Sequence, residues 1–286
     1  YILRFKKSIN KDKTKNMNNL EAYKMDGLGN DFIIFDKREK PISLSREQII
    51  KISDRNNIGC DQVIFIDKDK SSNIFLKFYN SDGGEIAACG NGSRCVAYIL
   101  GKEKNKNKIS LRTHERTIDA EIVGNLSVKI NMGKPIFEWQ KIPLSKKMDN
   151  KNIRINIDGH EFSGGFALNI GNPHIIFFVE DCFGFDLKKI GPIIENYEFF
   201  PDRCNVTFAQ ILDKKNIKVN VWERGAGQTK ACGTAACATA VAASVKGLVD
   251  KNSNIHFKEG NLQIDCKEEV FMTGPISKVK KIMVDI

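Results

Sequence analysis

Hydrophobic and polar residues alternate along many short segments of this chain, which is the pattern of strands with one buried face. Turn-forming Gly, Asn and Asp residues separate these segments. The alternation therefore predicts a strand-rich fold. The predicted strands cover residues 22–24, 31–36, 62–66, 74–79, 109–112, 117–123 and 126–131, and then 167–179 (with a turn at Gly171-Asn172), 206–210, 217–222, 254–257, 261–266 and 279–284.

Other segments have the spacing of helices. Residues 45–55 are amphipathic, and Ser45 with Gln48 forms a capping box at their start. A second helix is predicted near 186–196, where Pro192 limits its regular part. Residues 91–100 and 234–246 are small or apolar on nearly every face. Such helices are stable only when other elements surround them, so we expect both to be central.

The second half of the chain repeats the first at a distance of 142 or 143 residues. Ala-Cys-Gly occurs at 88–90 and again at 231–233, each time before one of the two apolar helices. Gly29-Asn30 returns as Gly171-Asn172, and further pairs follow in the same order. These matches indicate an internal duplication with one Cys-Gly turn in each half.

The duplication predicts two domains. We expect an N-terminal domain at 17–133 and a C-terminal domain at 134–274, joined by a hinge at 132–135. The last strand has no counterpart within the second half, so residues 275–286 are expected to complete the first. Residues 1–16 are predicted to be a disordered extension, with Met17 as the natural start.

Composition excludes several functional classes. Hydrophobic content is 41%, and no segment has the pattern of a membrane span or a signal peptide, so a cytoplasmic protein is predicted. Half of the +10 net charge lies in residues 1–16, and no nucleic-acid-binding motif is present.

The eight cysteines are spread over a long chain and should be reduced. Their spacing does not suit a metal site, so no metal is expected. Four of the eight cysteines are interpreted as inert, partly buried residues, namely Cys60, Cys182, Cys204 and Cys266.

Cys89 and Cys232 carry the candidate chemistry. Each precedes a glycine and the start of a helix, where free backbone N–H groups favour a thiolate and a bound carboxylate. Facing each other across one cleft, one sulfur would remove a proton from a carbon while the other delivers a proton to its opposite side. This reaction inverts the centre without a cofactor. The alternative is a pair of buried structural cysteines, which the repetition of Ala-Cys-Gly disfavours.

Seven segments, spread from residue 25 to residue 234, carry a resemblance to a known family. They are Met25-Asp26-Gly27-Leu28-Gly29-Asn30-Asp31-Phe32, Phe78-Tyr79-Asn80-Ser81-Asp82-Gly83, Cys89-Gly90-Asn91-Gly92, Gly171-Asn172-Pro173-His174, Asn205-Val206, Glu223-Arg224-Gly225 and Ala231-Cys232-Gly233-Thr234. In these segments the chain closely resembles the diaminopimelate epimerases, which are racemases independent of pyridoxal phosphate. Two departures are Asp26, where the family commonly has His or another polar residue, and the variable segment 235–237. Neither involves the assigned chemistry.

The resemblance implies an α/β (α+β) fold of two pseudo-symmetric domains, each a curled mixed β-sheet or barrel around a central helix. It implies that Cys89 and Cys232 are the acid and base, and that His174 and Glu223 tune them. The alternative for the polar residues is a structural role in turns, strand ends or surface ion pairs. The implied substrate-binding residues are Asn30, Gln62, Asn80, Gly90, Asn91, Asn172, Asn205, Glu223, Arg224, Gly233 and Thr234.

The activity implied is epimerisation of L,L-diaminopimelate to meso-diaminopimelate, which belongs to lysine and peptidoglycan-precursor biosynthesis. A related racemase acting on histidine or proline is the first alternative, and a redox or metal-binding module is the second. Glu223-Arg224 and four asparagines favour a substrate that is polar at both ends. The expected partner is a small molecule, and neither nucleic acid nor a membrane is expected. Whether the chain forms a homodimer is left undecided by the sequence.

Overall fold

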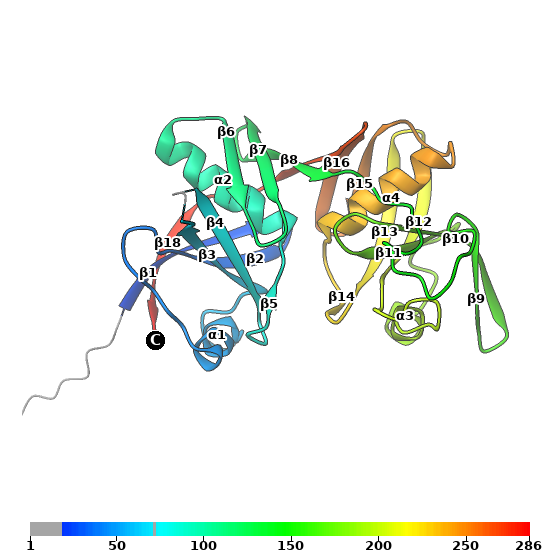
Figure 1. Ribbon diagram of the computed structural model, residues 1–286, viewed down its shortest axis with the longest axis horizontal. Helices are drawn as coiled ribbons and strands as arrows, with labels where there is room; N and C mark the ends of the chain where they lie inside the picture. Colours follow the sequence, from blue (N-terminus) through cyan, green and yellow to red (C-terminus); the bar gives the residue numbers. More distant parts are fainter. Residues whose placement is uncertain (1–18, 71–72) are drawn as a thin grey trace, which may run out of the picture.

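The computed structural model describes residues 19–70 and 73–286, and it forms two halves that lie side by side (Figure 1). The predicted extension at 1–16 and the proposed start at Met17 lie outside the described residues. The predicted fold class, two pseudo-symmetric halves of mixed sheet each with a central helix, is confirmed. Among the described residues, no helix is both long enough and apolar enough to cross a membrane.

The elements of the first half follow one another in a simple order. The long helix α2 carries Cys89 at its N-cap and ends at Asn105, whose left-handed backbone closes the helix. The elements are β1 (Asn19–Gly27), β2 (Asn30–Asp36), α1 (Arg46–Ser53), β3 (Gln62–Lys68), β4 (Ile74–Asn80), β5 (Glu85–Ile86), α2 (Gly90–Lys104), β6 (Lys108–Arg112), β7 (Thr117–Gly124) and β8 (Ser127–Gly133).

The second half repeats this order after one additional strand, β9. Its central helix α4 carries Cys232 at the N-cap and consists of small and apolar residues, nearly all buried. The elements are β9 (Ile153–Ile157), β10 (His160–Asn169), β11 (Pro173–Phe178), α3 (Leu187–Glu195), β12 (Asn205–Asp213), β13 (Asn216–Glu223), β14 (Gly227–Gln228), α4 (Gly233–Val245), β15 (Asn252–Phe257), β16 (Gly260–Cys266), β17 (Val270–Pro275) and β18 (Lys280–Asp285).

Strand register shows the duplication directly. β2 and β3 are parallel with Phe32 opposite Gln62, and β11 and β12 are parallel with His174 opposite Asn205. These are the same positions at the repeat distance inferred from the sequence. A substitution in one half can therefore be compared with the residue at the matched position of the other half.

Two strand pairs join the halves. β8 is antiparallel to β17, its counterpart in the duplication, so one hydrogen-bonded sheet runs through both halves. β18 leaves the second half and pairs with β1, with Leu20 opposite Val284. Gly133 ends β8 with a positive φ of 86°, a conformation that glycine adopts without strain. The division into domains at 133 and 134 stays a prediction.

Each half encloses its helix in apolar side chains. α2 packs against β1, β6, β7 and β8, while α4 packs against β10, β11, β12, β16 and β17. Beneath α3, the rings of Phe162, Phe177, Phe185 and Phe208 stack or meet edge to face. Both helices are central, as their apolar composition predicts, and their N-termini are consequently held by the core.

The sequence analysis missed four strands, of which β5 and β14 have only two residues each. β9 was not assigned, although its residues alternate between buried and exposed. β17 was not assigned either, and the last strand was expected to begin after Thr273-Gly274-Pro275. In the structure these residues complete β17, and Pro275 lies at the strand end opposite Ser127, where a missing N–H is tolerated. The missed strand β17 forms one of the two strand pairs that join the halves.

Candidate active site

The two predicted cysteines occupy equivalent N-caps. Cys89 precedes α2 and Cys232 precedes α4, and both have extended backbones with φ values of −136° and −130°. The Cys89 sulfur accepts a hydrogen bond from the Gly92 N–H at 3.5 Å. The Cys232 sulfur lies 3.4 Å from the hydroxyl oxygen of Thr234. An N–H group of the first helical turn therefore binds the Cys89 sulfur, whereas the Cys232 side chain makes no N-cap hydrogen bond.

The two Cys-Gly turns converge on one side chain, Met272 of β17. A Cβ on Gly90 would lie 2.9 Å from Met272 Cε, and a Cβ on Gly233 would lie 3.0 Å from the same atom. The Gly233 position is also 3.4 Å from the Asn91 side-chain oxygen. Glycine at both positions lets the backbones of the two helix N-termini approach each other over this methionine.

The polar residues predicted in the first half form two hydrogen-bonded groups, one of which contains Cys89. The side-chain oxygen of Asn30 accepts from the Cys89 thiol at 3.7 Å and from the Asn91 amide at 3.3 Å. The Gln62 amide donates to the Asn80 oxygen at 3.1 Å, in adjacent strands. The structure thus connects Asn30 with Cys89 and Asn91, and Gln62 with Asn80.

Charged residues that the sequence analysis missed hold Asn30 in place. The Asn30 amide donates to a carboxylate oxygen of Asp61 at 2.9 Å. Arg55 bridges Asp61 and Asp31, and Asp31 is also paired with Lys24. The proximity of Asp61 to Asn30 depends on the parallel pairing of β2 with β3, so no local motif marks it.

The polar residues predicted in the second half form a separate set. The His174 Nε2 donates to the Asn172 oxygen at 2.7 Å, and the imidazole is fully buried. The Asn205 side chain donates to the Pro173 carbonyl at 2.8 Å and accepts from the Arg224 N–H at 3.0 Å. The Arg224 side chain is exposed and donates to the Asp202 carbonyl. Asn205 therefore connects the strand of His174 with Arg224.

A buried carboxylate at the end of α3 was also missed. Glu195 accepts from the Trp222 indole N–H at 2.7 Å and from the Gly225 N–H at 2.9 Å. It also pairs with Arg203. These contacts hold both ends of the segment that carries Glu223 and Arg224. Glu195 follows an ordinary helix, and a sequence pattern gives no reason to single it out.

The pKa values of both cysteine thiols are raised above their ordinary value in the structure. Burial raises the pKa of Cys89 to about 11, and the Gly92 N–H opposes that rise. Burial raises the pKa of Cys232 well above its ordinary value, and the neighbouring Glu223 carboxylate adds to the rise. Burial also raises the pKa of Glu223. The backbone N–H groups lower the pKa of both thiols, in the predicted direction, but burial outweighs them, so the net shift of each pKa is upward. Since Glu223 acts on both thiols, both lie within its electrostatic reach.

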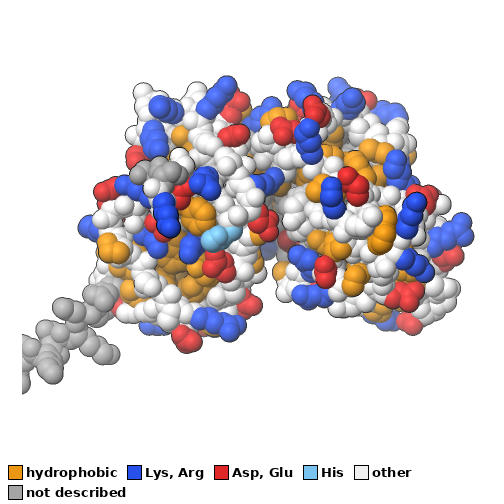
Figure 2. All heavy atoms as spheres, viewed as in Figure 1, with side chains coloured by type: hydrophobic (Ala, Val, Ile, Leu, Met, Phe, Trp, Pro, Cys, Tyr) orange, Lys and Arg blue, Asp and Glu red, His pale blue; other side chains and the backbone are white. Residues whose placement is uncertain are grey.

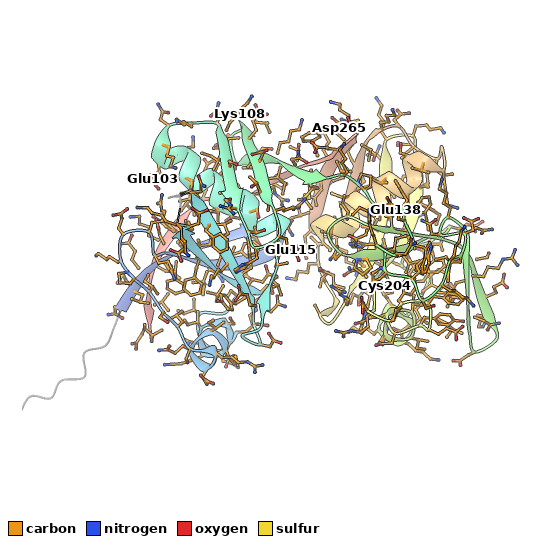
Figure 3. The ribbon with its side chains drawn as sticks, in the orientation of Figure 1. Glu103, Lys108, Glu115, Glu138, Cys204 and Asp265 are labelled. Carbon is orange, nitrogen blue, oxygen red and sulfur yellow. The ribbon has the colours of Figure 1, made fainter. Side chains whose placement is uncertain are left out.

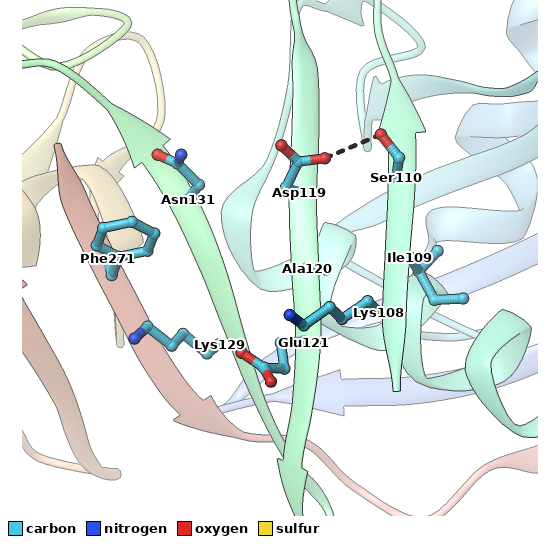
Figure 4. Close-up of a pocket in the computed structure, with 9 residues that line it drawn as sticks. All are labelled: Lys108, Ile109, Ser110, Asp119, Ala120, Glu121, Lys129, Asn131 and Phe271. Carbon is cyan, nitrogen blue, oxygen red and sulfur yellow. Dashed lines mark hydrogen bonds between the residues drawn. The ribbon is translucent and has the colours of Figure 1, made fainter. Parts of the chain in front are cut away.

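Other parts of the molecule are less suited to this chemistry. The described residues contain no cluster of three or more His, Cys, Asp or Glu side chains that could hold a metal ion. Cys60, Cys182, Cys204 (labelled in Figure 3) and Cys266 are free and buried. Figure 4 shows a cavity of about 410 Å³ over β6, β7 and β8, where Ser110 and Asp119 are hydrogen-bonded, but none of the predicted site residues lines it. The space-filling view shows an indentation between the two halves (Figure 2).

Comparison with known proteins gives one consistent result. The family model described as "Diaminopimelate epimerase" matches residues 22–138 and 166–279. The chain is 51% identical over 272 residues to a diaminopimelate epimerase from Pelagibacter ubique, covering 93% of this chain and 99% of that protein. It is 37% identical over 262 residues to one from Wolbachia sp. subsp. Brugia malayi, covering 91% and 99%.

Solved structures agree on the fold. A hydroxyproline epimerase from Agrobacterium vitis matches with a TM-score of 0.66 at 12% identity, over 94% of this chain and 93% of that one. A phenazine biosynthesis protein of the PhzF family from Bacillus anthracis matches with a TM-score of 0.62 at 16% identity, over 94% and 100%. At these identities the likeness concerns the fold alone.

Proposed function

Since the chain belongs to the diaminopimelate epimerase family, we propose that it converts L,L-diaminopimelate to meso-diaminopimelate with Cys89 and Cys232 as paired base and acid. The observation that carries this proposal is the convergence of two equivalent Cys-Gly turns on Met272. A small-molecule substrate fits between two such turns. The reaction belongs to lysine and peptidoglycan-precursor biosynthesis, and we place it in the cytoplasm.

The proposed mechanism transfers one proton out of the substrate and one into it. The thiolate of one cysteine removes the α-proton and becomes a thiol. The thiol of the other cysteine protonates the opposite face of the carbon and becomes a thiolate, so charge and protons balance. The N–H groups of Gly90, Asn91, Gly233 and Thr234 hold the α-carboxylate, where negative charge develops in the transition state. The mechanism uses two thiols and no cofactor.

We assign recognition of the far end of the substrate, away from the reacting carbon, to the polar residues of both halves. The exposed guanidinium of Arg224 can hold the second carboxylate through two parallel hydrogen bonds. Glu223 can accept from an ammonium group, and His174 and Glu223 influence the protonation of the site. Asn30, Gln62, Asn80, Asn172 and Asn205 supply the remaining hydrogen bonds.

A related racemase of histidine or proline type is the second candidate. The fold shared with a hydroxyproline epimerase supports it. Exchange of the α-proton in D₂O separates the two candidates. We expect deuterium incorporation into L,L-diaminopimelate and not into histidine or proline. Exchange into either of those two without exchange into diaminopimelate would overturn the proposal.

Replacing either cysteine tests the two-thiol mechanism. Cys89→Ala and Cys232→Ala should each lower kcat by at least ~10²–10⁴-fold, because each face of the carbon needs its own proton carrier. The measurement is the rate of meso-diaminopimelate formation. Cys266→Ala is the control, since this buried cysteine belongs to neither turn, and it should keep normal turnover. Near-normal turnover by either active-site variant contradicts the mechanism.

A further inference from the structure

A fully buried arginine lies behind the two Cys-Gly turns. Arg94 is in α2, one and a half turns after Cys89, and its side chain has no exposed surface. It forms no ion pair with any residue of the described ranges 19–70 and 73–286. Its Nε has no hydrogen-bond partner there. An isolated charge in the protein interior costs several kcal/mol of stability, so an unpaired buried cation calls for a functional reason.

The protein backbone is shaped around this guanidinium. Nη1 donates to the Met272 sulfur at 3.6 Å, and Nη2 donates to the Pro275 carbonyl at 3.5 Å. A Cβ on Gly274 would lie 3.0 Å from Arg94 Cζ, and a Cβ on Gly27 would lie 3.4 Å from Nη2. Glycines of β17 and β1 therefore leave room for the cation between the two strands.

Met272 connects Arg94 with the cleft. The same methionine that contacts the guanidinium lies beneath Gly90 and Gly233, where the two helix N-termini meet. The cation thus lies one side chain below the point at which a carboxylate would be held. The repeat places Cys237 at the matched position of α4, so this charge is present on the Cys89 side only.

We propose that Arg94 is a positioning residue of this site: a fixed buried cation that stabilises negative charge on Cys89 and on a carboxylate held between the two Cys-Gly turns. This inference rests on the proposed function. Arg94 does not touch the substrate, and it acts through the field of its charge across Met272. In a water-poor interior such a field is screened weakly. The Glu223 carboxylate acts on both thiols, and Arg94 is the positive charge that opposes it at Cys89.

The electrostatics of the cysteines are consistent with this asymmetry. At Cys89 two larger effects, burial and the Glu223 carboxylate, raise the pKa, and the charge of Arg94 lowers it. At Cys232 the same carboxylate adds to the rise of the pKa that burial causes. The groups that face Arg94 are the thiols of Cys89, Cys95 and Cys237 and the carboxylate of Asp26. Cys95 and Cys237 are buried in the helices, which leaves Cys89 as the thiol that opens to the cleft.

The test measures alkylation of the thiols rather than turnover. The rate of iodoacetamide reaction at Cys89 and at Cys232 is followed by mass spectrometry from pH 6 to 11. Arg94→Met keeps the length and apolar stem but removes the charge. Because the pKa of Cys89 is about 11, this range covers the rising limb of its profile. We expect Arg94→Met to displace that limb to higher pH by about one unit, with a smaller change at Cys232. Arg94→Lys keeps a positive charge and should restore part of the shift.

Thermal unfolding separates this role from a structural one. Replacing an unpaired buried cation by an apolar side chain should leave Tm unchanged or raise it, while kcat/KM for diaminopimelate falls at least ~10-fold. Arg116→Met is the matched control, because the side chain of this half-buried arginine donates to the Met132 carbonyl, away from Met272 and Pro275, the hydrogen-bond partners of Arg94. It should not change the Cys89 profile. If Arg94→Met does not fold, Arg94→Gln is the second neutral variant.

Two outcomes overturn the proposal. One is a Cys89 profile that stays within 0.2 pH units of the native one in a folded neutral variant. The other is a lower Tm and lower activity with an unchanged profile, which would make Arg94 structural. The alkylation assay contains no amino-acid substrate. A protein that fails to exchange the α-proton of diaminopimelate therefore overturns the proposed function without deciding the role of Arg94.

Discussion

The imidazole of His174 is fully buried beside Asn172, and its Nδ1 has no hydrogen-bond partner among the described residues. Burial lowers its pKa to about 3, and the positive charge of Arg224 contributes to the decrease. His174 is therefore neutral from about pH 4 upward, with Nε2 as the donor. At neutral pH it can orient Asn172, and it cannot act as a cation.

This burial makes stability depend on pH. The unfolded chain binds a proton at His174 below its ordinary pKa of 6.5, whereas the folded chain does not until about pH 3. The free energy of unfolding should therefore fall with decreasing pH in that window, by up to ~1.4 kcal/mol per pH unit. His174→Gln should remove this contribution, as measured by urea unfolding between pH 4 and 7. Identical pH slopes for the two proteins would show that His174 is protonated in the folded state.

Arg224 should determine the choice of substrate. Arg224→Lys keeps the charge but loses the planar two-point contact with a carboxylate. We expect kcat/KM for diaminopimelate to fall by a factor that corresponds to about 1.5–3 kcal/mol of charge-assisted hydrogen bonding. Activity on lysine should not rise, because the remaining polar residues still suit a charged distal end. Steady-state kinetics on both substrates measures this. An unchanged kcat/KM for diaminopimelate would place Arg224 outside the distal site.

At the scale of the elements, composition predicted the helices well and the joining strand poorly. α2 and α4 are apolar on nearly every face, so the sequence alone indicated that they are central and that Cys89 and Cys232 begin them. β17, whose Gly-Pro end resembles a turn, was missed. Its strand character comes from pairing with β8, which lies far away in sequence.

Residues that act through tertiary contacts were not identified from the sequence either. Asp61 reaches Asn30 only because β2 and β3 are parallel, and Arg94 is enclosed by glycines of β1 and β17. Each looks like an ordinary charged residue in the sequence. Recognising such a supporting residue requires the neighbours that the fold supplies, whereas the cysteines are marked by their own repeated motif.

The end of α3 should govern the segment that follows β13. Glu195→Gln keeps the size of the side chain but replaces one of its acceptor oxygens by an amide donor, which faces the Trp222 and Gly225 N–H groups or Arg203. We expect a loss of about 1–3 kcal/mol in the free energy of unfolding and a higher KM. Glu198→Gln, an exposed neighbour, is the control. If urea unfolding and KM are the same in both variants, Glu195 does not hold the segment.

At the scale of the whole molecule, the convergence of the halves makes the two thiols a redox-sensitive pair. Mild oxidation should join Cys89 to Cys232 and remove both proton carriers at once. The expected result is a loss of activity that dithiothreitol reverses, with a linked peptide pair found by mass spectrometry. Cys266→Ala should be inactivated at the same rate. Inactivation with both thiols still alkylatable would contradict the proposed proximity.

The strand pairs that join the halves also affect how the chain is made. β1 and β8 are synthesised early, but their partners β18 and β17 come from the C-terminal part of the chain. Until the ribosome has produced those partners, the sheet of the N-terminal half has two uncovered edges, to which other chains can add. A ribosome that stalls within the second half therefore leaves both strand edges exposed to other chains. The pairing that brings the two cysteines together in the finished enzyme thus makes the growing chain dependent on uninterrupted translation.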